Sequence, residues 1–444
     1  MAFTARTLGS AHLRISAAGS VFWFGGWLKR MFHARFCRMA FRLMLPILIW
    51  NHPTVVWAIE PVIEDSQEAP SATDSDAVPG RERAVQSLFP VLISLGAHAG
   101  YDTNSRTTTD NEGSFFTSQE LTLSYDRSRG PTQIDLVAGM QAVERFSRGT
   151  DINGFLDLSL THNVSPRLSL SAGIDAAYRA EPDFSSDVGP NTRQGNYFTS
   201  SDRIAASYEW TDRWSTVTSY SFRVVRYENS EAAFFTDREE HGFGEELRFE
   251  LGRHTVLVGD YRLLLVDYDS FPRDSTTHFA LMGVEQTFTP RLTAQGRAGA
   301  SFRSFETGEH SIDPDFEGSL DYALARYSSL SWNMRYGVEE PSVQDALSRT
   351  TFRTGLQLRY GFTPKLSSAI GFFYHHDDTM GGTTVATLGP TFSTDAFDLS
   401  LSARYQLTSH LDLDAGFQHS DVSSGGIDTS YSRDRYTVGI NFTF

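Results

Sequence analysis

The chain has 444 residues, of which 21% are charged and 13% aromatic, and its formal net charge is −16. No run of about 18 apolar residues follows residue 58, so helices do not carry that part of the chain through a membrane. The acidic balance excludes nucleic acid as a partner. The single cysteine, Cys37, excludes a disulfide framework.

Residues 1–58 have the layout of a secretory signal. All of their charged side chains are basic, and the first acid is Glu60. Residues 43–50 form a short apolar core, and Val56 and Ala58 supply small residues at positions −3 and −1 of a cleavage site. The pattern predicts cleavage after Ala58. An uncleaved N-terminal anchor is the alternative, but the apolar core is too short for one.

Residues 59–89 are predicted to be a disordered periplasmic linker. The segment is acidic, rich in Pro and Ser, and shows no hydrophobic periodicity. It is too short for a plug or passenger domain. Seven of the 38 basic residues lie in 1–58, so residues 59–444 carry 31 basic and 54 acidic residues, a formal net charge of −23.

From Val91 onward, apolar and polar residues alternate with a period of two, which is typical of β-strands with one apolar face. Clear examples are residues 91–101, 121–125, 156–160 and 411–417. The strands are separated alternately by short and long polar segments. The short turns lie near 163–167, 211–213, 251–254, 289–291, 327–329, 363–365 and 408–410. The longer segments lie near 102–113, 180–195, 227–237, 268–275, 303–313, 339–348, 376–395 and 419–430.

This alternation predicts an all-β fold for residues 90–444: a transmembrane, antiparallel, up-and-down β-barrel with short periplasmic turns and long external loops. Counting from Val91 gives 18 strands. Residues 383–393 are either the upper part of a strand or a hairpin within a loop, so 16 strands are also possible.

Tryptophan supports this orientation. After the leader, the only tryptophans are Trp210, Trp214 and Trp332, and all three flank short turns. Together with Tyr125, Tyr208, Tyr360 and Phe362, they predict a periplasmic aromatic girdle. Ordinary hairpin aromatics are the alternative explanation.

If the apolar face meets lipid, the opposite face lines the interior. Since a charge facing lipid near the bilayer centre costs about 2–4 kcal/mol, the charged residues of that face are predicted to line a pore. They are Arg223, Arg248, Asp260, Arg262, Arg297, Glu317, Asp321, Arg335, Arg353, Arg359, Asp412 and Asp414. The arginines either pair with carboxylates of the wall, which is the favoured reading, or attract anionic solutes.

No catalytic motif stands out, so we expect no enzyme activity, no catalytic residues and no cofactor. The sequence His375-His376-Asp377-Asp378 is rich in possible metal ligands. We interpret it as part of a solvated loop, with metal binding as the weaker alternative, and predict no metal site.

The chain ends on a strand in which Tyr436, Val438, Ile440, Phe442 and Phe444 alternate with small or polar residues. It resembles the last strand of bacterial outer-membrane barrels, whose C-terminal aromatic is read by the barrel-assembly machinery. The resemblance implies that Tyr436, Phe442 and Phe444 form the membrane-insertion signal. It also implies that the protein is located in the outer membrane, in contact with its lipid and lipopolysaccharide.

The segment Ala99-Gly-Tyr-Asp-Thr-Asn104 closes the first strand. A first strand ending in this way, in a chain that ends on Phe, resembles the β-barrel porin family 2, over about residues 90–444. The resemblance implies an outer-membrane pore for hydrophilic solutes or exported polysaccharide, with polysaccharide-export components as possible partners. A structural or adhesive barrel acting through its external loops is the alternative, and a barrel-rim enzyme is a less favoured one.

Overall fold

The computed structural model describes residues 91–107, 112–128, 130–147, 149–180, 195–270, 272–341, 346–381, 392–425 and 430–444. The expected signal (1–58) and linker (59–89) lie outside these residues. Within them, no helix is long and apolar enough to cross a bilayer.

The described residues form eighteen strands and one short helix. In chain order these are β1 (Val91–Asp102), β2 (Ser114–Arg127), β3 (Thr132–Arg145), β4 (Gly149–Ser165), β5 (Leu168–Ala180), β6 (Asn196–Glu209), β7 (Trp214–Tyr227), α3 (Ser230–Thr236), β8 (Arg238–Gly252), β9 (Thr255–Tyr268), β10 (Ser275–Thr289), β11 (Leu292–Phe305), β12 (His310–Ala325), β13 (Ser328–Glu339), β14 (Ala346–Gly361), β15 (Leu366–Gly381), β16 (Phe392–Gln406), β17 (Leu411–Ser424) and β18 (Tyr431–Thr443).

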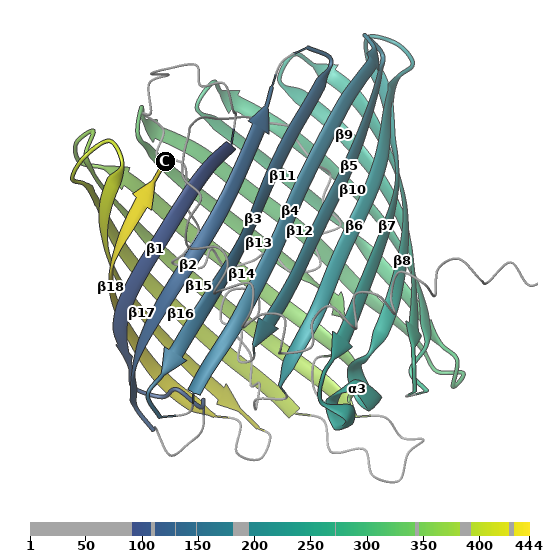
Figure 1. Ribbon diagram of the computed structural model, residues 1–444. Coiled ribbons are helices and arrows are strands. Elements are labelled where there is room, and N and C mark those ends of the chain that lie inside the picture. Colours follow the sequence, from purple (N-terminus) through teal and green to yellow (C-terminus); the bar gives the residue numbers. More distant parts are fainter. Residues whose placement is uncertain are drawn as a thin grey trace, which may run out of the picture. The chain divides into compact units, whose positions relative to one another are not determined.

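The strands close into one antiparallel barrel (Figure 1). Each strand pairs with the next, and β1 pairs with β18 from Ser94 opposite Thr443 to Asp102 opposite Arg435. Closure leaves no strand with a free edge, so the backbone donors and acceptors of the sheet are paired within it. The expected all-β, up-and-down barrel is confirmed, with 18 strands rather than 16.

Alternate side chains of each strand point to opposite faces of the barrel wall. On β18, Tyr436, Val438, Ile440 and Phe442 are exposed, whereas Arg433 on the other face is buried. The exposed set lies on the convex outer face, where side chains diverge. Side chains of the concave inner face converge, which allows strands that are not neighbours in the sheet to contact one another through them.

The two ends of the barrel differ in their connections. Both β1 and β18 have their terminal ends at the end where the short connections lie, such as Pro290-Arg291 between β10 and β11. The opposite end carries α3 and the longer connections, with the exception of residues 146–148 between β3 and β4. Three of the expected long loops are shorter than predicted, because the flanking strands extend into them. Residues 306–309 connect the strands where 303–313 was expected, residues 382–391 where 376–395 was expected, and residues 425–430 where 419–430 was expected.

The segment His375-His376-Asp377-Asp378 belongs to β15, so its interpretation as a solvated loop is wrong. Strand alternation splits it between the two faces: His375 and Asp377 are buried, while Asp378 is exposed. The four side chains therefore do not converge on one ion. Among the described residues, no group of three or more His, Cys, Asp or Glu side chains has the arrangement of a metal site.

The aromatic residues expected to mark one end lie near the short connections. Trp210 and Trp214 flank the connection between β6 and β7, and both are exposed. Tyr208, Tyr360 and Phe362 are exposed in the same zone. Two of the indole N–H groups in this zone have a partner, since Trp210 donates to Thr216 Oγ1 at 3.1 Å and Trp332 to Thr354 Oγ1 at 2.9 Å.

Candidate functional site

The inner face of the barrel carries most of the buried charge. By strand register, all twelve residues predicted to line a pore lie on this face. The structure brings Arg248, Asp260, Arg262, Arg297 and Glu317 together in one network, and it places Arg335 and Arg353 beside a second carboxylate cluster.

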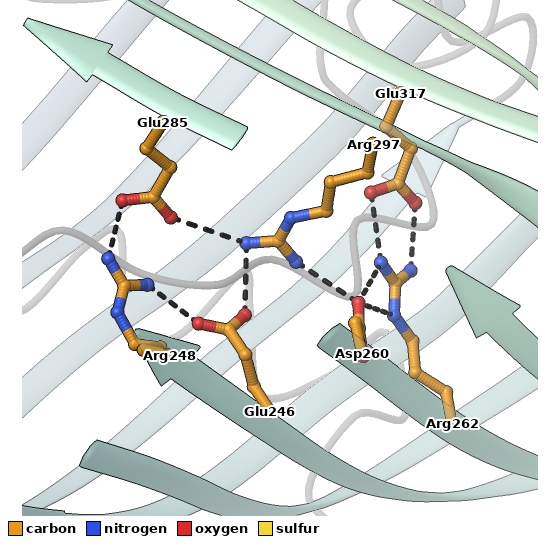
Figure 2. A network of polar contacts seen from close by, with 7 residues as sticks. All are labelled: Glu246, Arg248, Asp260, Arg262, Glu285, Arg297 and Glu317. Carbon is orange, nitrogen blue, oxygen red and sulfur yellow. Dashed lines mark hydrogen bonds and ion pairs between the residues drawn. The ribbon is translucent and has the colours of Figure 1, made fainter. Parts of the chain in front are cut away.

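Figure 2 shows the first network, which runs over β8 to β12 and contains seven residues. Arg262 makes a bidentate pair with Glu317, at 2.8 and 2.9 Å, although the two residues lie three strands apart. Its Nε and Nη2 also donate to Asp260 Oδ2 at 2.8 and 2.6 Å. Only the concave face of a closed sheet brings such distant strands within reach of one guanidinium.

Arg297 joins this group to the rest of the network. Its Nη1 lies 3.1 Å from Asp260 Oδ2, and its Nη2 lies 2.9 Å from Glu246 Oε2 and 3.7 Å from Glu285 Oε1. Arg248 completes the chain through ion pairs with Glu246, at 2.6 Å, and with Glu285. We call these seven residues the charged network: Glu246, Arg248, Asp260, Arg262, Glu285, Arg297 and Glu317.

A glycine makes the reach of Arg297 possible. Arg297 lies on β11 opposite Gly283 on β10, and its side chain passes over Gly283 toward β8 and β9. A Cβ at Gly283 would lie 2.6 Å from Arg297 Cγ and 2.5 Å from the carbonyl oxygen of Gly296. The absence of a side chain at this position therefore holds the path of the guanidinium open.

The charged network alternates acid and base. Glu246 and Asp260 are direct register partners on β8 and β9, and Arg297 lies between their carboxylates. The side chains of Glu246, Asp260 and Arg262 are at most 6% exposed. At such burial an unpaired charge would be strongly destabilising, and in this network three arginines pair with four carboxylates.

A second cluster surrounds Glu339 at the end of β13. Glu339 Oε2 accepts from Arg349 at 2.9 Å and from Arg353 at 2.7 Å, and Arg335 lies 4.0 Å from its other oxygen. Arg349 also pairs with Asp377 at 3.3 Å. Three arginines thus share two carboxylates, in contrast to the charged network, where three arginines share four.

A third cluster lies at the end with the longer connections. Glu340 is buried, accepts a hydrogen bond from Tyr268 at 2.7 Å and pairs with Arg303. Burial opposes the ionisation of Glu340, but the nearby guanidinium groups, Arg303 foremost, hold its pKa below the ordinary value of a glutamate. Arg273 stacks 4.2 Å from the Tyr268 ring and donates to the carbonyl of Phe235 in α3, so the helix is tied to this cluster.

The inner wall across from the charged network is more open. On β3 to β5, the inward residues Asp135, Asp157 and Asp175 are exposed, as are Ser159 and Ser171. These side chains face solvent inside the barrel. The inner surface is therefore lopsided, with interlocked buried charges over β8 to β12 and accessible carboxylates and hydroxyls over β3 to β5.

The inner face also carries apolar side chains, which the expectation of a polar interior missed. Val258, Val266, Phe279 and Leu281 are buried on the inward side of β9 and β10. They pack in the same sector as the charged network. Their effect is to exclude water from its arginines and carboxylates, which strengthens the ion pairs once both partners are in place.

The remaining predicted residues are spread around the inner face. Asp412 pairs with Arg404 at 3.1 Å, and Asp414 contacts His98 at 3.3 Å and accepts from Asn441 at 2.6 Å. Arg223, Asp321 and Arg359 lie on other strands, opposite Glu240, Thr293 and Ser329 respectively.

Several residues of these clusters were missed from the sequence. Glu339, Glu340, Arg303 and Arg349 take part in buried ion pairs, and Glu285 takes part in a half-buried one. Glu285 lies on β10, where the consecutive residues Leu281 and Met282 make both faces apolar. The alternation of apolar and polar residues therefore does not show which side chains of this strand point inward.

A family model described as "Putative MetA-pathway of phenol degradation" matches residues 273–427, about a third of the chain. No curated protein matches the sequence significantly.

Solved structures with a similar arrangement of strands include the following. The crystal structure of Pseudomonas aeruginosa OpdK with vanillate matches at 12% identity and a TM-score of 0.43, over 80% of this chain and 99% of that one. P. aeruginosa OccK2 (OpdF) in complex with glucuronate matches at 12% identity and a TM-score of 0.45, over 80% and 98%. Acinetobacter baumannii OccAB4 matches at 12% identity and a TM-score of 0.40, over 80% and 98%.

Proposed function

We propose that this barrel is an outer-membrane pore for small hydrophilic solutes. The observation that carries the proposal is the inversion of polarity across the wall. Exposed Leu, Val, Ile and aromatic side chains cover the outer face, whereas the inner face carries charged and polar side chains. Such a surface is suited to lipid outside and water inside, and a closed 18-stranded barrel is too wide for side chains alone to fill.

The accessible charge inside the barrel defines the class of solute. The arginines of the charged network are buried against carboxylates, whereas Asp135, Asp157 and Asp175 on the opposite wall are exposed. The inner surface that solutes meet over β3 to β5 is therefore acidic. We expect cations and neutral polar solutes to pass more readily than anions. This preference is opposite to the one expected if the inner-face arginines attracted anionic solutes.

The test is the reversal potential of single channels in planar bilayers under a salt gradient. The parent protein is expected to conduct and to prefer cations, and D157N/D175N to shift the reversal potential toward anions. The matched control D378N removes a charge from the outer face of β15 and should leave selectivity unchanged. Protein that inserts and does not conduct would contradict the pore, and an unchanged D157N/D175N would contradict the role of this wall.

The export of polysaccharide is a finer proposal that rests on the resemblance of the segment from Ala99 to Asn104. A gene for a polysaccharide-export lipoprotein or glycosyltransferases beside this one would support it. A functional test would compare surface polysaccharide in cells with and without the protein. Normal surface polysaccharide in the deletion strain would speak against export and leave the pore for small solutes intact.

Other expectations stay predictions. They are the lack of enzyme activity, contact with lipopolysaccharide and the barrel-assembly machinery, and cleavage of the signal after Ala58. The partial match to the phenol-degradation family model makes phenol a reasonable solute for uptake assays. An adhesive role would require that deleting external loops abolishes a phenotype while conductance is retained.

A further inference from the structure

The short connections at one end of the barrel share a basic residue. Each of the eight contains Arg, Lys or His: Arg129, Arg167, Arg213, Arg253, Arg291, Arg326, Lys365 and His410. All of those that the structure describes are exposed, and Asp212 is the one acid in these eight segments. We call the seven described residues, from Arg167 to His410, the basic collar.

Five of the connections repeat one local design, in which Ser or Thr is followed two residues later by the basic residue. The hydroxyl accepts from the backbone N–H of that residue, as Thr211 does from Arg213 at 3.3 Å and Thr363 from Lys365 at 3.2 Å. Ser165, Thr289 and Thr408 accept in the same way from Arg167, Arg291 and His410. Such turns fix where the basic residue lies.

The residue after each of these five basic residues is apolar and, by strand register, points outward. These residues are Leu168, Trp214, Leu292, Leu366 and Leu411. Other apolar residues of the same zone are strongly exposed, including Leu251 at 60%, Phe288 at 61% and Phe362 at 59%. Each cation thus lies beside an outward apolar surface, as at the boundary between acyl chains and headgroups.

Three arginines of the basic collar are available to a ligand. Arg167, Arg213 and Arg291 form no ion pair with any other described residue. At the opposite end the exposed Arg106 and the half-buried Arg226 are paired, with Glu112 at 3.0 Å and Glu239 at 2.6 Å. Acids such as Asp269 and Glu306 are also common in the connections there. The cations without partners are therefore concentrated at the short-turn end.

We propose that the basic collar binds the phosphate headgroups of anionic phospholipids in the adjoining membrane leaflet. The proposal rests on the proposed function in one respect: the outer face must lie in a bilayer. The spacing favours lipid over a protein partner, because one basic residue per hairpin follows the circumference of the closed sheet rather than one patch. Arginine suits the ligand, since its guanidinium binds phosphate in a bidentate manner.

The test measures lipid binding by the full chain in detergent, using native mass spectrometry. Short-chain phosphatidylglycerol is compared with phosphatidylcholine of the same length. The parent is expected to prefer phosphatidylglycerol. R213Q/R291Q should weaken that binding by about fivefold for each charge removed and leave phosphatidylcholine unchanged. R213K/R291K keeps both charges and should retain most of the preference.

The matched control is R106Q/R226Q, which removes one exposed and one half-buried charge at the other end and should not affect phosphatidylglycerol binding. Equal binding of both lipids by the parent would overturn the proposal, as would an unchanged R213Q/R291Q that remains folded. A third outcome would also overturn the proposal. In it, the parent shows no lipid preference, whereas a variant with the acids of residues 59–76 changed to amides does. Those acids, and not lipid, would then bind the collar in the parent. The lipid-binding assay does not depend on conductance. A barrel that conducts but shows no lipid preference would therefore refute this inference and leave the proposed function intact.

Discussion

Asp102 on the first strand and Arg433 on the last strand form a buried bidentate ion pair across the seam of the barrel. Arg433 Nε lies 2.9 Å from Asp102 Oδ1, and Nη2 lies 2.5 Å from Oδ2. The side chain of Arg433 is 2% exposed and that of Asp102 is 1% exposed. The seam thus joins the two ends of the chain by side-chain charge as well as by the backbone pairing of β1 with β18.

Breaking this pair should loosen the closure of the barrel. D102N leaves the Arg433 guanidinium buried beside a neutral partner, and we expect a loss of about 3–5 kcal/mol in the free energy of unfolding. The measurement is urea unfolding of the folded barrel in detergent micelles. The control E112Q breaks the pair with Arg106, whose side chains are about half exposed, and should cost about 0–1 kcal/mol. Similar losses for the two variants would contradict a special role for the seam pair.

The last residue should matter for assembly more than for transport. The backbone N–H of Phe444 donates to the Ile93 carbonyl at 2.9 Å, and its ring packs 4.4 Å from that of Phe442. F444D replaces one ring of this aromatic pair with a carboxylate beside Phe442. We expect the amount of folded protein in the outer membrane to fall severalfold, while the conductance of each inserted channel stays normal. F444Y is the matched control, and normal membrane levels of F444D would refute the assignment.

Removing Arg297 should affect both stability and selectivity. R297Q leaves the opposed carboxylates of Glu246 and Asp260 without the cation between them. We expect a loss of about 3–5 kcal/mol and a shift of the reversal potential toward cations. The double variant R297Q/E246Q should recover part of the stability because one carboxylate is neutralised. Additive losses would show that the two residues do not act on each other.

Gly283 should tolerate no side chain. G283A introduces a Cβ against Arg297 and the Gly296 carbonyl, so we expect a loss of about 1–3 kcal/mol from overpacking. The matched control is G259A on β9, where an added Cβ meets nothing within 4 Å. Urea unfolding compares the two, and an equal effect at both positions would contradict the role of Gly283 in guiding Arg297.

The Glu340 cluster should make stability depend on pH. Because the pKa of Glu340 is lower in the folded state than its ordinary value, its ionised form adds stability above that ordinary value. This contribution is lost as the pH falls through the folded pKa. E340Q removes the contribution at neutral pH, so its stability should approach that of the parent under acid conditions. A constant difference between the two proteins at all pH values would contradict this explanation.

The sequence allowed the architecture to be predicted because alternation repeats on most strands and short and long connections alternate. The strand of residues 431–443 and the turn at Pro290-Arg291 illustrate both signals. Prediction from the sequence failed where strands continue beyond the part of the wall whose outer face is apolar. The stretch from His375 to Asp378 is polar on both faces, so no periodicity of hydrophobicity distinguishes it from a loop.

The partners within the inner wall could not be predicted. Alternation places Arg262 and Glu317 on the inner face, but their contact spans three strands and depends on the curvature of the closed barrel. On β10, Phe279 and Leu281 point inward while Met282 points outward, so the inward position of Glu285 is hidden. The Ser/Thr turns with their basic residues form a repeated pattern in the sequence, but hydrophobic periodicity does not reveal it, because periodicity marks turns only as boundaries between strands.

The shared carboxylates of the charged network have a consequence for how the sequence of this barrel can change during evolution. Because Arg297 and Arg248 both depend on Glu246, a single substitution there leaves neighbours uncompensated, and viable variants must arise as coordinated sets. The exposed Asp157 and Asp175 carry no comparable burial. New solute preferences should therefore arise by single steps on that wall, and laboratory evolution of uptake should accumulate its first mutations on β4 and β5.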